Sequence, residues 1–129
     1  MPLKADIELI KELSQAGYIT SYLGAGDSAI NYAQELEKAG CDFINLVNKT
    51  SIYEMACVLK TCRVLVSIDT GTMHLGCALD IPLVSVFYEN KMTYYWAPDD
   101  RIYNVKVIKE NQSADNIYVK LMELLNKDK

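Results

Sequence analysis

The sequence lacks an excess of basic residues: it has 13 lysines and arginines against 17 acidic residues, which gives a net charge of −4. This balance argues against a nucleic-acid-binding protein and against a polybasic membrane anchor. Long apolar runs are also missing, so no segment is expected to span a bilayer. Residues 1–11 lack the apolar stretch and the cleavage site of a signal peptide, which favours a cytoplasmic protein.

The sequence is also poor in residues that bind metals in paired spacings. It has a single histidine, His74, and four cysteines. No two cysteines form a C-x-x-C pair, which argues against a zinc ribbon and against a thioredoxin-like motif. We therefore expect no metal site and four free thiols, most of them buried, in a reducing compartment. The cysteines are Cys41, Cys57, Cys62 and Cys77.

Half of the 129 residues are apolar, which is enough for one hydrophobic core, so residues 1–129 are expected to form a single domain. Apolar periodicity and turn residues predict that helices and strands alternate. Helices are predicted over residues 6–16, 28–39, from 51 onward, 71–79 and 115–126, and strands over 18–23, 43–47, 64–68, 83–87 and 105–108. This alternation predicts an α/β fold, a Rossmann-like parallel sheet with helices on both faces. The first predicted helix has no strand before it.

Local patterns refine the predicted helices. Asp27 or Ser28 is expected to be an N-cap, because short polar side chains accept hydrogen bonds from the first turn. Ser51 and Glu54 form the S-x-x-E pattern of a capping box. The helix over residues 71–79 is apolar almost all round, so it is expected to lie well inside the protein.

The strongest candidate site lies at residues 69–74, Asp-Thr-Gly-Thr-Met-His, between a predicted strand and a predicted helix. Ligands of open parallel sheets bind beyond the carboxyl ends of the strands. The first helical turn offers free N–H groups, Gly71 allows close approach, and two threonine hydroxyls add donors, which together suit a phosphate or diphosphate. His74 could donate to the same anion, whereas Asp69 suits sugar hydroxyls. The structural alternative is that Asp69 caps the helix and His74 is a half-buried ring with its hydrogen bonds satisfied.

A second candidate lies at residues 24–29, Gly-Ala-Gly-Asp-Ser-Ala, which match the G-x-G-x-x-A dinucleotide fingerprint. The acidic residue expected about 20 positions later is missing, since residues 45–48 there are Asn-Leu-Val-Asn. A glycine-rich turn with a helix cap is the structural alternative. The predicted loop over residues 88–104 carries three aromatics that could stack on a base or pin the loop. Nucleophile-elbow, P-loop and H-E-x-x-H motifs are absent.

Residues 64–87, VLVSIDTGTMHLGCALDIPLVSVF, resemble the signature segment of glycosyltransferase family 9, the ADP-heptose:lipopolysaccharide heptosyltransferases. That segment has D-T-G-x-M-H-L between a buried strand and a helix of small residues. Residues 45–54, NLVNKTSIYE, resemble the family's L-x-G-K-T-S-L-x-E-L stretch. Asn48 stands at the place of its glycine, a mild change because asparagine tolerates left-handed backbone. The resemblance covers roughly residues 5–110.

The resemblance implies the C-terminal half of a GT-B glycosyltransferase, without its first strand. This half would bind a nucleotide-sugar donor, ADP-linked heptose or another nucleoside-diphosphate sugar, in the assembly of bacterial surface polysaccharide or lipopolysaccharide. The catalytic base and the saccharide or lipid-linked acceptor would belong to the N-terminal half, so the chain alone is expected to be inactive. No cofactor is expected, and the protein would act in the cytoplasm, including the inner face of the membrane. An open sheet edge offers a surface for a homodimer.

The resemblance also assigns site residues. The donor diphosphate would meet Thr70, Gly71, Thr72 and His74, and its sugar side Asp69. Weaker donor-binding positions are Gly24, Gly26, Asp27, Tyr88 and Glu89. Residues 87–90 are Phe-Tyr-Glu-Asn where the family has F-G-P-T, which leaves the sugar open. Two alternatives remain: a non-catalytic remnant that binds a nucleotide or a partner protein, and an NAD(P)-binding Rossmann domain that uses the glycine turn at residues 24–26.

Overall fold

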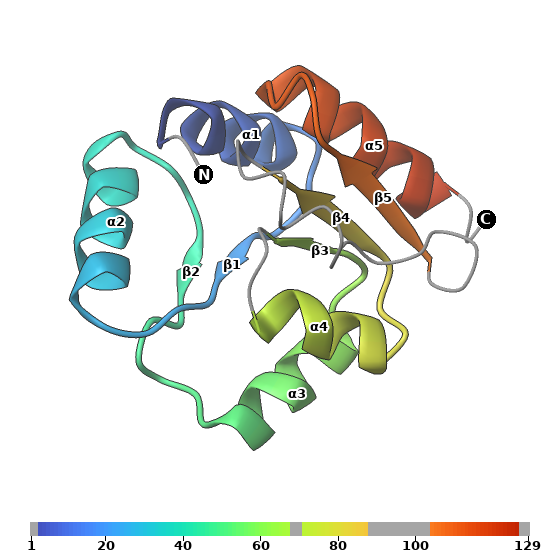
Figure 1. The fold of residues 1–129 in the computed structure, drawn as a ribbon. Helices are drawn as coiled ribbons and strands as arrows, with labels where there is room; N and C mark the ends of the chain where they lie inside the picture. The colour runs from blue at the N-terminus through green and yellow to red at the C-terminus, as the bar shows by residue number, and fades with distance from the viewer. Residues whose placement is uncertain (1–2, 68–70, 88–103, 127–129) are drawn as a thin grey trace. The chain divides into compact units, whose positions relative to one another are not determined.

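The computed structural model describes residues 3–67, 71–87 and 104–126. Contacts group the chain into two compact units, Met1–Met55 and Ala56–Lys129, which are described separately. The described strands pair in parallel, as predicted, and form a two-stranded sheet in the first unit and a three-stranded sheet in the second. Among the described elements, helices and strands alternate from α1 to β4, and β4 is followed by β5 and then α5 (Figure 1).

The first unit contains two helices and a pair of short strands. Their bounds are α1 Leu3–Gln15, β1 Ser21–Tyr22, α2 Asp27–Lys38 and β2 Ile44–Asn45. Strand β1 pairs in parallel with β2, with Ser21 opposite Ile44. Both strands are shorter than the sequence predicts: among the described strands β1 and β2 pair with each other alone, and Ile19, just before β1, is 83% exposed.

Helix α2 begins one residue earlier than predicted, and its N-cap is Gly26 rather than Asp27 or Ser28. Gly26 has φ 88° and ψ 177°, a conformation that glycine adopts readily because it has no Cβ. This backbone lets the helix start at Asp27, so the carboxylate of Asp27 lies in the first turn and does not cap it. The predicted cap residue was therefore wrong because the glycine conformation decides where the helix starts.

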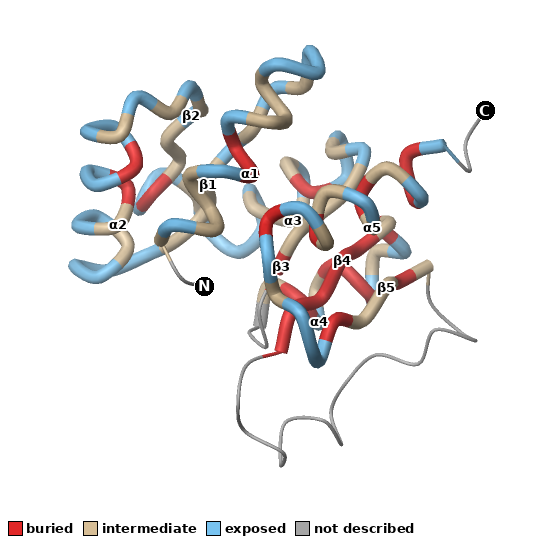
Figure 2. Tube along the Cα trace, turned by 90° about the horizontal axis from the view of Figure 1, so that it is seen from above, coloured by how far each residue is buried: buried red, intermediate tan, exposed pale blue. Residues whose placement is uncertain are grey.

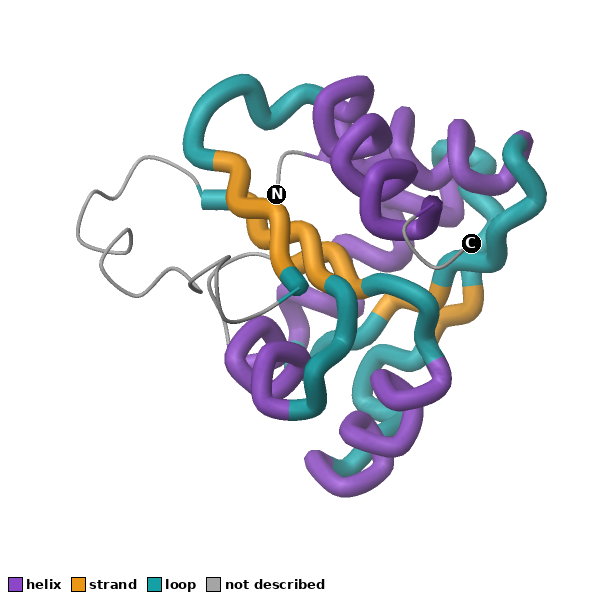
Figure 3. The backbone as a smooth tube through the Cα atoms, turned by 90° about the vertical axis from the view of Figure 1, so that its right-hand side faces the viewer, coloured by secondary structure: helices purple, strands orange, loops and turns teal. Residues whose placement is uncertain are grey.

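The second unit is a three-stranded parallel sheet covered by helices. Helix α3, Ile52–Thr61, leads into it, and its other elements are β3 Leu65–Ser67, α4 Gly71–Ala78, β4 Leu83–Val86, β5 Val105–Ile108 and α5 Ala114–Asn126. The strand order is β3-β4-β5. Helices α4 and α5 both contact β4 and lie on opposite sides of the strands (Figures 1 and 3). Coverage of both faces is thus confirmed for this sheet.

Strand β4 is the centre of this core, and all four of its residues are buried (Figure 2). Leu83 and Phe87 pack with Met73 and Cys77 of α4, so this face of the strand is covered by α4. Side chains alternate across a strand, so Val84 and Val86 point to the opposite face, where α5 contacts the strand. A strand that is buried on both faces is typical of a parallel sheet covered on both sides.

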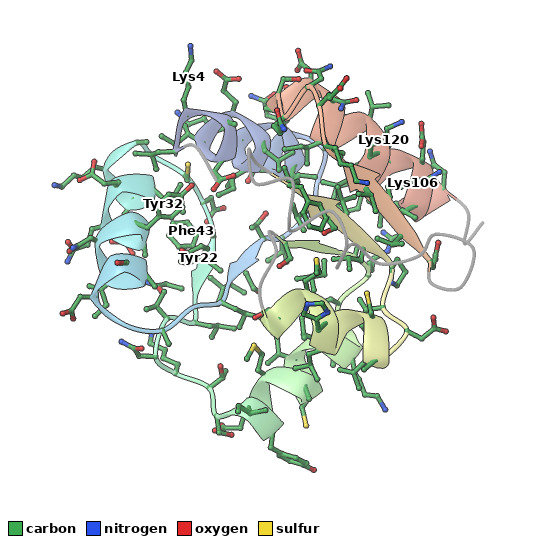
Figure 4. The ribbon with its side chains drawn as sticks, viewed as in Figure 1. Lys4, Tyr22, Tyr32, Phe43, Lys106 and Lys120 are labelled. Carbon is green, nitrogen blue, oxygen red and sulfur yellow. The ribbon has the colours of Figure 1, made fainter. Side chains whose placement is uncertain are left out.

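Polar contacts also tie the second unit together. The Ser85 hydroxyl is 2.8 Å from the Met73 sulfur, which joins β4 to α4. Lys106 of β5 forms an ion pair with Glu123 of α5 at 3.5 Å, and Lys120 approaches the same carboxylate at 3.9 Å (Figure 4). These ion pairs are partly exposed, so each contributes little to stability. Apolar packing on β4 therefore dominates the stability of this unit.

A carboxylate lies between the two helices of the first unit. The Tyr32 hydroxyl of α2 donates a hydrogen bond to Asp6 Oδ2 of α1, while Asp6 Oδ1 is buried and has no hydrogen-bond partner among the described residues. Tyr22 stacks on Tyr32 with ring centroids 5.7 Å apart, and Phe43 meets Tyr22 edge-on at 6.4 Å (Figure 4). Burial raises the pKa of Asp6, although the Tyr32 hydrogen bond and the N-terminal charge oppose this shift.

Replacing Asp6 by asparagine is expected to flatten the dependence of stability on pH. A raised pKa lets the folded protein keep a proton that the unfolded chain has lost, so the free energy of unfolding falls as the pH rises from 3.8 through the folded value. Asp6→Asn keeps a carbonyl acceptor for Tyr32 and removes the buried charge. Urea unfolding at about pH 4 and about pH 7 measures the difference. Glu8→Gln, an exposed acid on α1, is the control, and parallel profiles for Asp6→Asn and wild type would contradict this role of Asp6.

Candidate functional site

The candidate site residues follow the carboxyl ends of parallel strands. Strand β1 leads through the glycine turn of residues 24–26 into α2, and β2 leads through residues 46–51 into α3. In the second unit β3 leads into α4. These are the positions at which ligands of open α/β sheets bind.

The glycine turn is built from two glycines with different tasks. A Cβ on Gly24 would lie 2.9 Å from the Ala29 Cβ, so only glycine allows the turn to pass this close to α2. Gly26 has φ 88°, which favours glycine for conformational reasons, and a Cβ there would meet open space. The turn predicted from the G-x-G-x-x-A pattern is therefore present, with Ala29 as the small residue against which Gly24 packs.

Asn48 connects the two turns of the first unit. Its N–H donates to the Gly24 carbonyl at 2.9 Å, and its Oδ1 accepts a hydrogen bond from the Gly26 N–H at 2.9 Å. Asn48 has φ 57°, so the expected tolerance for left-handed backbone is confirmed at this position. The sequence predicted the backbone conformation of Asn48. Its side-chain contact with residue 26 spans 22 positions, and no local sequence pattern predicted it.

The capping box before α3 is confirmed. The Glu54 N–H donates to Ser51 Oγ at 3.1 Å, and the Ser51 N–H donates to Glu54 Oε1 at 3.1 Å. The hydrogen bond from the Ser51 backbone N–H lowers the pKa of Glu54 most, and a hydrogen bond with the Ser51 side chain lowers it further. The box fixes the start of α3 immediately after the turn that contains Asn48.

Replacing Ser51 by alanine is expected to lower the free energy of unfolding by about 1 kcal/mol, since a serine N-cap is lost. Ser51→Asp is the matched control, because its carboxylate can accept the same hydrogen bond from the Glu54 N–H. Urea unfolding of both variants measures the effect. Equal losses in Ser51→Ala and Ser51→Asp would show that the cap does not stabilise α3.

The strongest predicted site lies only partly within the described residues. Helix α4 begins at Gly71, with Thr72 half-buried and His74 exposed. Asp69 and Thr70 lie outside the described residues, as do Tyr88 and Glu89 after β4. The structure thus places two candidate side chains, two positions apart, at the start of a helix that follows a parallel strand.

Helix α4 is less buried than the sequence predicts. Met73 and Cys77 face the core, whereas His74 and Ala78 are exposed. The helix contacts both β3 and β4. A Cβ on Gly76 would lie 2.8 Å from Leu65 Cδ2, which shows how closely the buried side approaches β3. The exposed side includes His74, the residue that the site prediction requires to be accessible.

The four cysteines are free thiols, and only Cys77 is buried. The prediction that most are buried is wrong: Cys57 is exposed because α3 buries only Leu59, and Cys41 and Cys62 are half-buried. Burial raises the pKa of the thiols at positions 41, 62 and 77. Among residues 3–67, 71–87 and 104–126, no three metal-ligating side chains lie together. No helix in the same ranges is long and apolar enough to cross a membrane.

Several known proteins are similar in sequence. Residues 7–125 match glycosyltransferase family 9 (heptosyltransferase). Over 86 residues, 62% of this chain, the sequence is 30% identical to lipopolysaccharide heptosyltransferase 2 of Salmonella typhimurium and covers 24% of that protein. It is 29% identical over 86 residues to lipopolysaccharide heptosyltransferase 2 of Escherichia coli, again covering 24% of its length.

Solved structures share the fold. E. coli ADP-heptose lipopolysaccharide heptosyltransferase II superposes with a TM-score of 0.78 at 20% identity, over 98% of this chain and 42% of the other. E. coli heptosyltransferase WaaC with ADP superposes with a TM-score of 0.81 at 23% identity, over 95% of this chain and 39% of the other. The structure of WaaC with ADP-2-deoxy-2-fluoro heptose superposes with a TM-score of 0.75 at 25% identity, over 97% of this chain and 38% of the other.

The chain spans about a quarter of the length of the curated relatives and about two-fifths of the solved ones. Within that span the α/β fold with parallel strands corresponds to part of a heptosyltransferase structure. Because the family match extends over residues 7–125, the chain belongs to glycosyltransferase family 9.

Proposed function

We propose that this chain binds the nucleotide-sugar donor of a family 9 glycosyl transfer, as the donor half of a two-domain enzyme. The observation that carries the proposal is the start of α4, which follows a parallel strand and holds Thr72 and an exposed His74 in its first turn. Backbone N–H groups at such a position favour phosphate groups. WaaC, which has the same fold, is known with ADP and with ADP-2-deoxy-2-fluoro heptose, which supports a donor of this chemical class.

The donor-binding residues proposed on this basis are Asp69, Thr70, Gly71, Thr72 and His74. The N–H groups, the hydroxyls and His74 would hold the diphosphate, and Asp69 would accept hydrogen bonds from the sugar. Gly24, Gly26, Asp27, Tyr88 and Glu89 are proposed as weaker donor-binding positions. A divalent metal is not required in this proposal.

In this reaction the bond from the sugar's anomeric carbon to the diphosphate oxygen breaks, a bond to the acceptor oxygen forms, and negative charge develops on the leaving diphosphate. Hydrogen-bond donors that are already oriented stabilise this charge more in the transition state than in the ground state. His74 and the first turn of α4 would serve in this way, whereas a base outside this chain would remove the proton from the acceptor hydroxyl.

We also propose that the catalytic base and the saccharide or lipid-linked acceptor belong to the other half of the enzyme, since solved relatives are more than twice as long as this chain. The chain alone would then bind donor without transferring it. The reaction would take place in the cytoplasm, at the inner face of the membrane where the acceptor is lipid-linked, and would serve lipopolysaccharide or surface-polysaccharide assembly. Dimerisation through an open sheet edge is a further part of this proposal.

Thermal unfolding of this chain with ADP, UDP, GDP, CDP and NAD tests the proposal. A nucleoside diphosphate at 100 times its dissociation constant should stabilise the fold by about 2.7 kcal/mol. ADP is expected to give the largest shift, since ADP-linked compounds occupy the solved relative. A shift with NAD alone would point to the glycine turn as a dinucleotide site. No shift with any nucleotide at millimolar concentration would favour a non-binding remnant of the fold.

A further inference from the structure

We propose that Asn48 is a positioning residue, which holds the glycine turn of residues 24–26 in the shape that receives the nucleotide of the donor. This inference rests on the proposed function. Asn48 follows β2, and the glycine turn follows the neighbouring parallel strand β1, so both lie at the same edge of that sheet. The inference concerns the geometry of the turn and not a direct contact with the ligand.

Asn48 holds the glycine turn at both ends. Its backbone N–H donates to the Gly24 carbonyl, and its side-chain oxygen accepts from the Gly26 N–H, both at 2.9 Å. Because the Gly26 N–H can only donate, the amide oxygen of Asn48 must point toward it and the NH₂ group must point away. The orientation of the side chain is therefore fixed by the chemistry of its partner.

The turn needs such a restraint because its own residues do little to fix its backbone conformation. Two of its three residues are glycines, which lose more conformational freedom on folding than other residues. Gly26 is the N-cap of α2 and, as a glycine, has no side chain that could accept a hydrogen bond from the first turn. The side-chain bond from Asn48 supplies an external restraint that a glycine cap cannot provide.

Core packing does not explain Asn48, since both Asn48 and Gly26 are exposed. A glycine, which the family pattern has at this place, could adopt the same φ of 57° but would lack the acceptor oxygen. The side chain of Asn48 therefore adds a restraint on an accessible turn, where restraint serves binding more than stability.

The experiment compares Asn48→Gly with Asn111→Gly in the 129-residue chain. Asn111 is an exposed asparagine with φ 56°, so the control makes the same chemical change at the same backbone conformation. Calorimetric titration with ADP should show a dissociation constant about two- to tenfold higher in Asn48→Gly, the effect of one lost hydrogen bond. Asn111→Gly should bind ADP like the wild type.

Amide hydrogen exchange tests the restraint without ligand. Exchange at Gly26 should accelerate about two- to tenfold in Asn48→Gly and stay near the wild-type rate in Asn48→Asp, whose carboxylate oxygen can still accept the bond. Unchanged exchange in Asn48→Gly would overturn the restraint. Unchanged ADP affinity in Asn48→Gly would overturn the positioning role while the proposed function stands. If the wild type binds no nucleoside diphosphate, the proposed function is wrong and Asn48 has no donor to serve.

Discussion

Replacing Phe87 by alanine is expected to lower the free energy of unfolding by about 3–5 kcal/mol. Phe87 is 1% exposed and packs with Met73 and Cys77 of α4 and with Leu83. Truncation of its side chain therefore leaves a cavity in the core of the second unit. Its backbone N–H donates to the Ile108 carbonyl at 2.8 Å, which holds the end of β4 to β5. Because the whole fold has about 5–15 kcal/mol of stability, this loss is a large share of it.

Urea unfolding with a two-state fit measures this change, provided that the m-value stays close to that of the wild type. Phe87→Leu is the matched control: it keeps most of the apolar volume and should cost much less than the alanine variant. If Phe87→Ala cost about 1 kcal/mol or less, as surface substitutions do, Phe87 would not be the core residue that its burial indicates.

Local sequence patterns predicted the elements whose form depends on neighbouring residues. The capping box at Ser51 and Glu54 has both reciprocal hydrogen bonds, because the two partners lie three positions apart. Strand β5 has the predicted bounds of residues 105–108, and all four residues of β4 are buried. In each case side-chain type and spacing carried enough information to predict the structure.

The sequence could not predict features that depend on distant partners. The start of α2 depends on the φ of Gly26 and on its contact with Asn48, which lies 22 positions away. The Asp6–Tyr32 hydrogen bond spans 26 positions, and no pattern marks either residue. The exposure of one side of α4 could not be predicted for the same reason: the apolar composition of this helix does not reveal which neighbouring elements cover it. For the candidate site, sequence located the turns, and the structure added how Asn48 restrains one of them.

Replacing His74 by alanine is expected to raise the dissociation constant for ADP by roughly 10- to 100-fold. A hydrogen bond to a charged group contributes about 1.5–3 kcal/mol, and each 1.4 kcal/mol corresponds to a factor of ten in affinity. His74 lies in the first turn of α4, where its ring would add a donor to the N–H groups that are proposed to hold the diphosphate. Calorimetric titration of the 129-residue chain with ADP measures this effect.

The controls separate loss of a ligand contact from loss of structure. His74 is exposed, so His74→Ala should change the free energy of unfolding without ligand by no more than about 0.5 kcal/mol. His74→Gln retains an N–H donor and should recover part of the affinity, whereas Ala78→Ser, an exposed change one turn later on α4, should leave it unchanged. If His74→Ala bound ADP as tightly as the wild type, His74 would not contact the diphosphate. Equal losses in His74→Ala and Ala78→Ser would instead indicate a general disturbance of the helix, since only position 74 is proposed to contact the ligand.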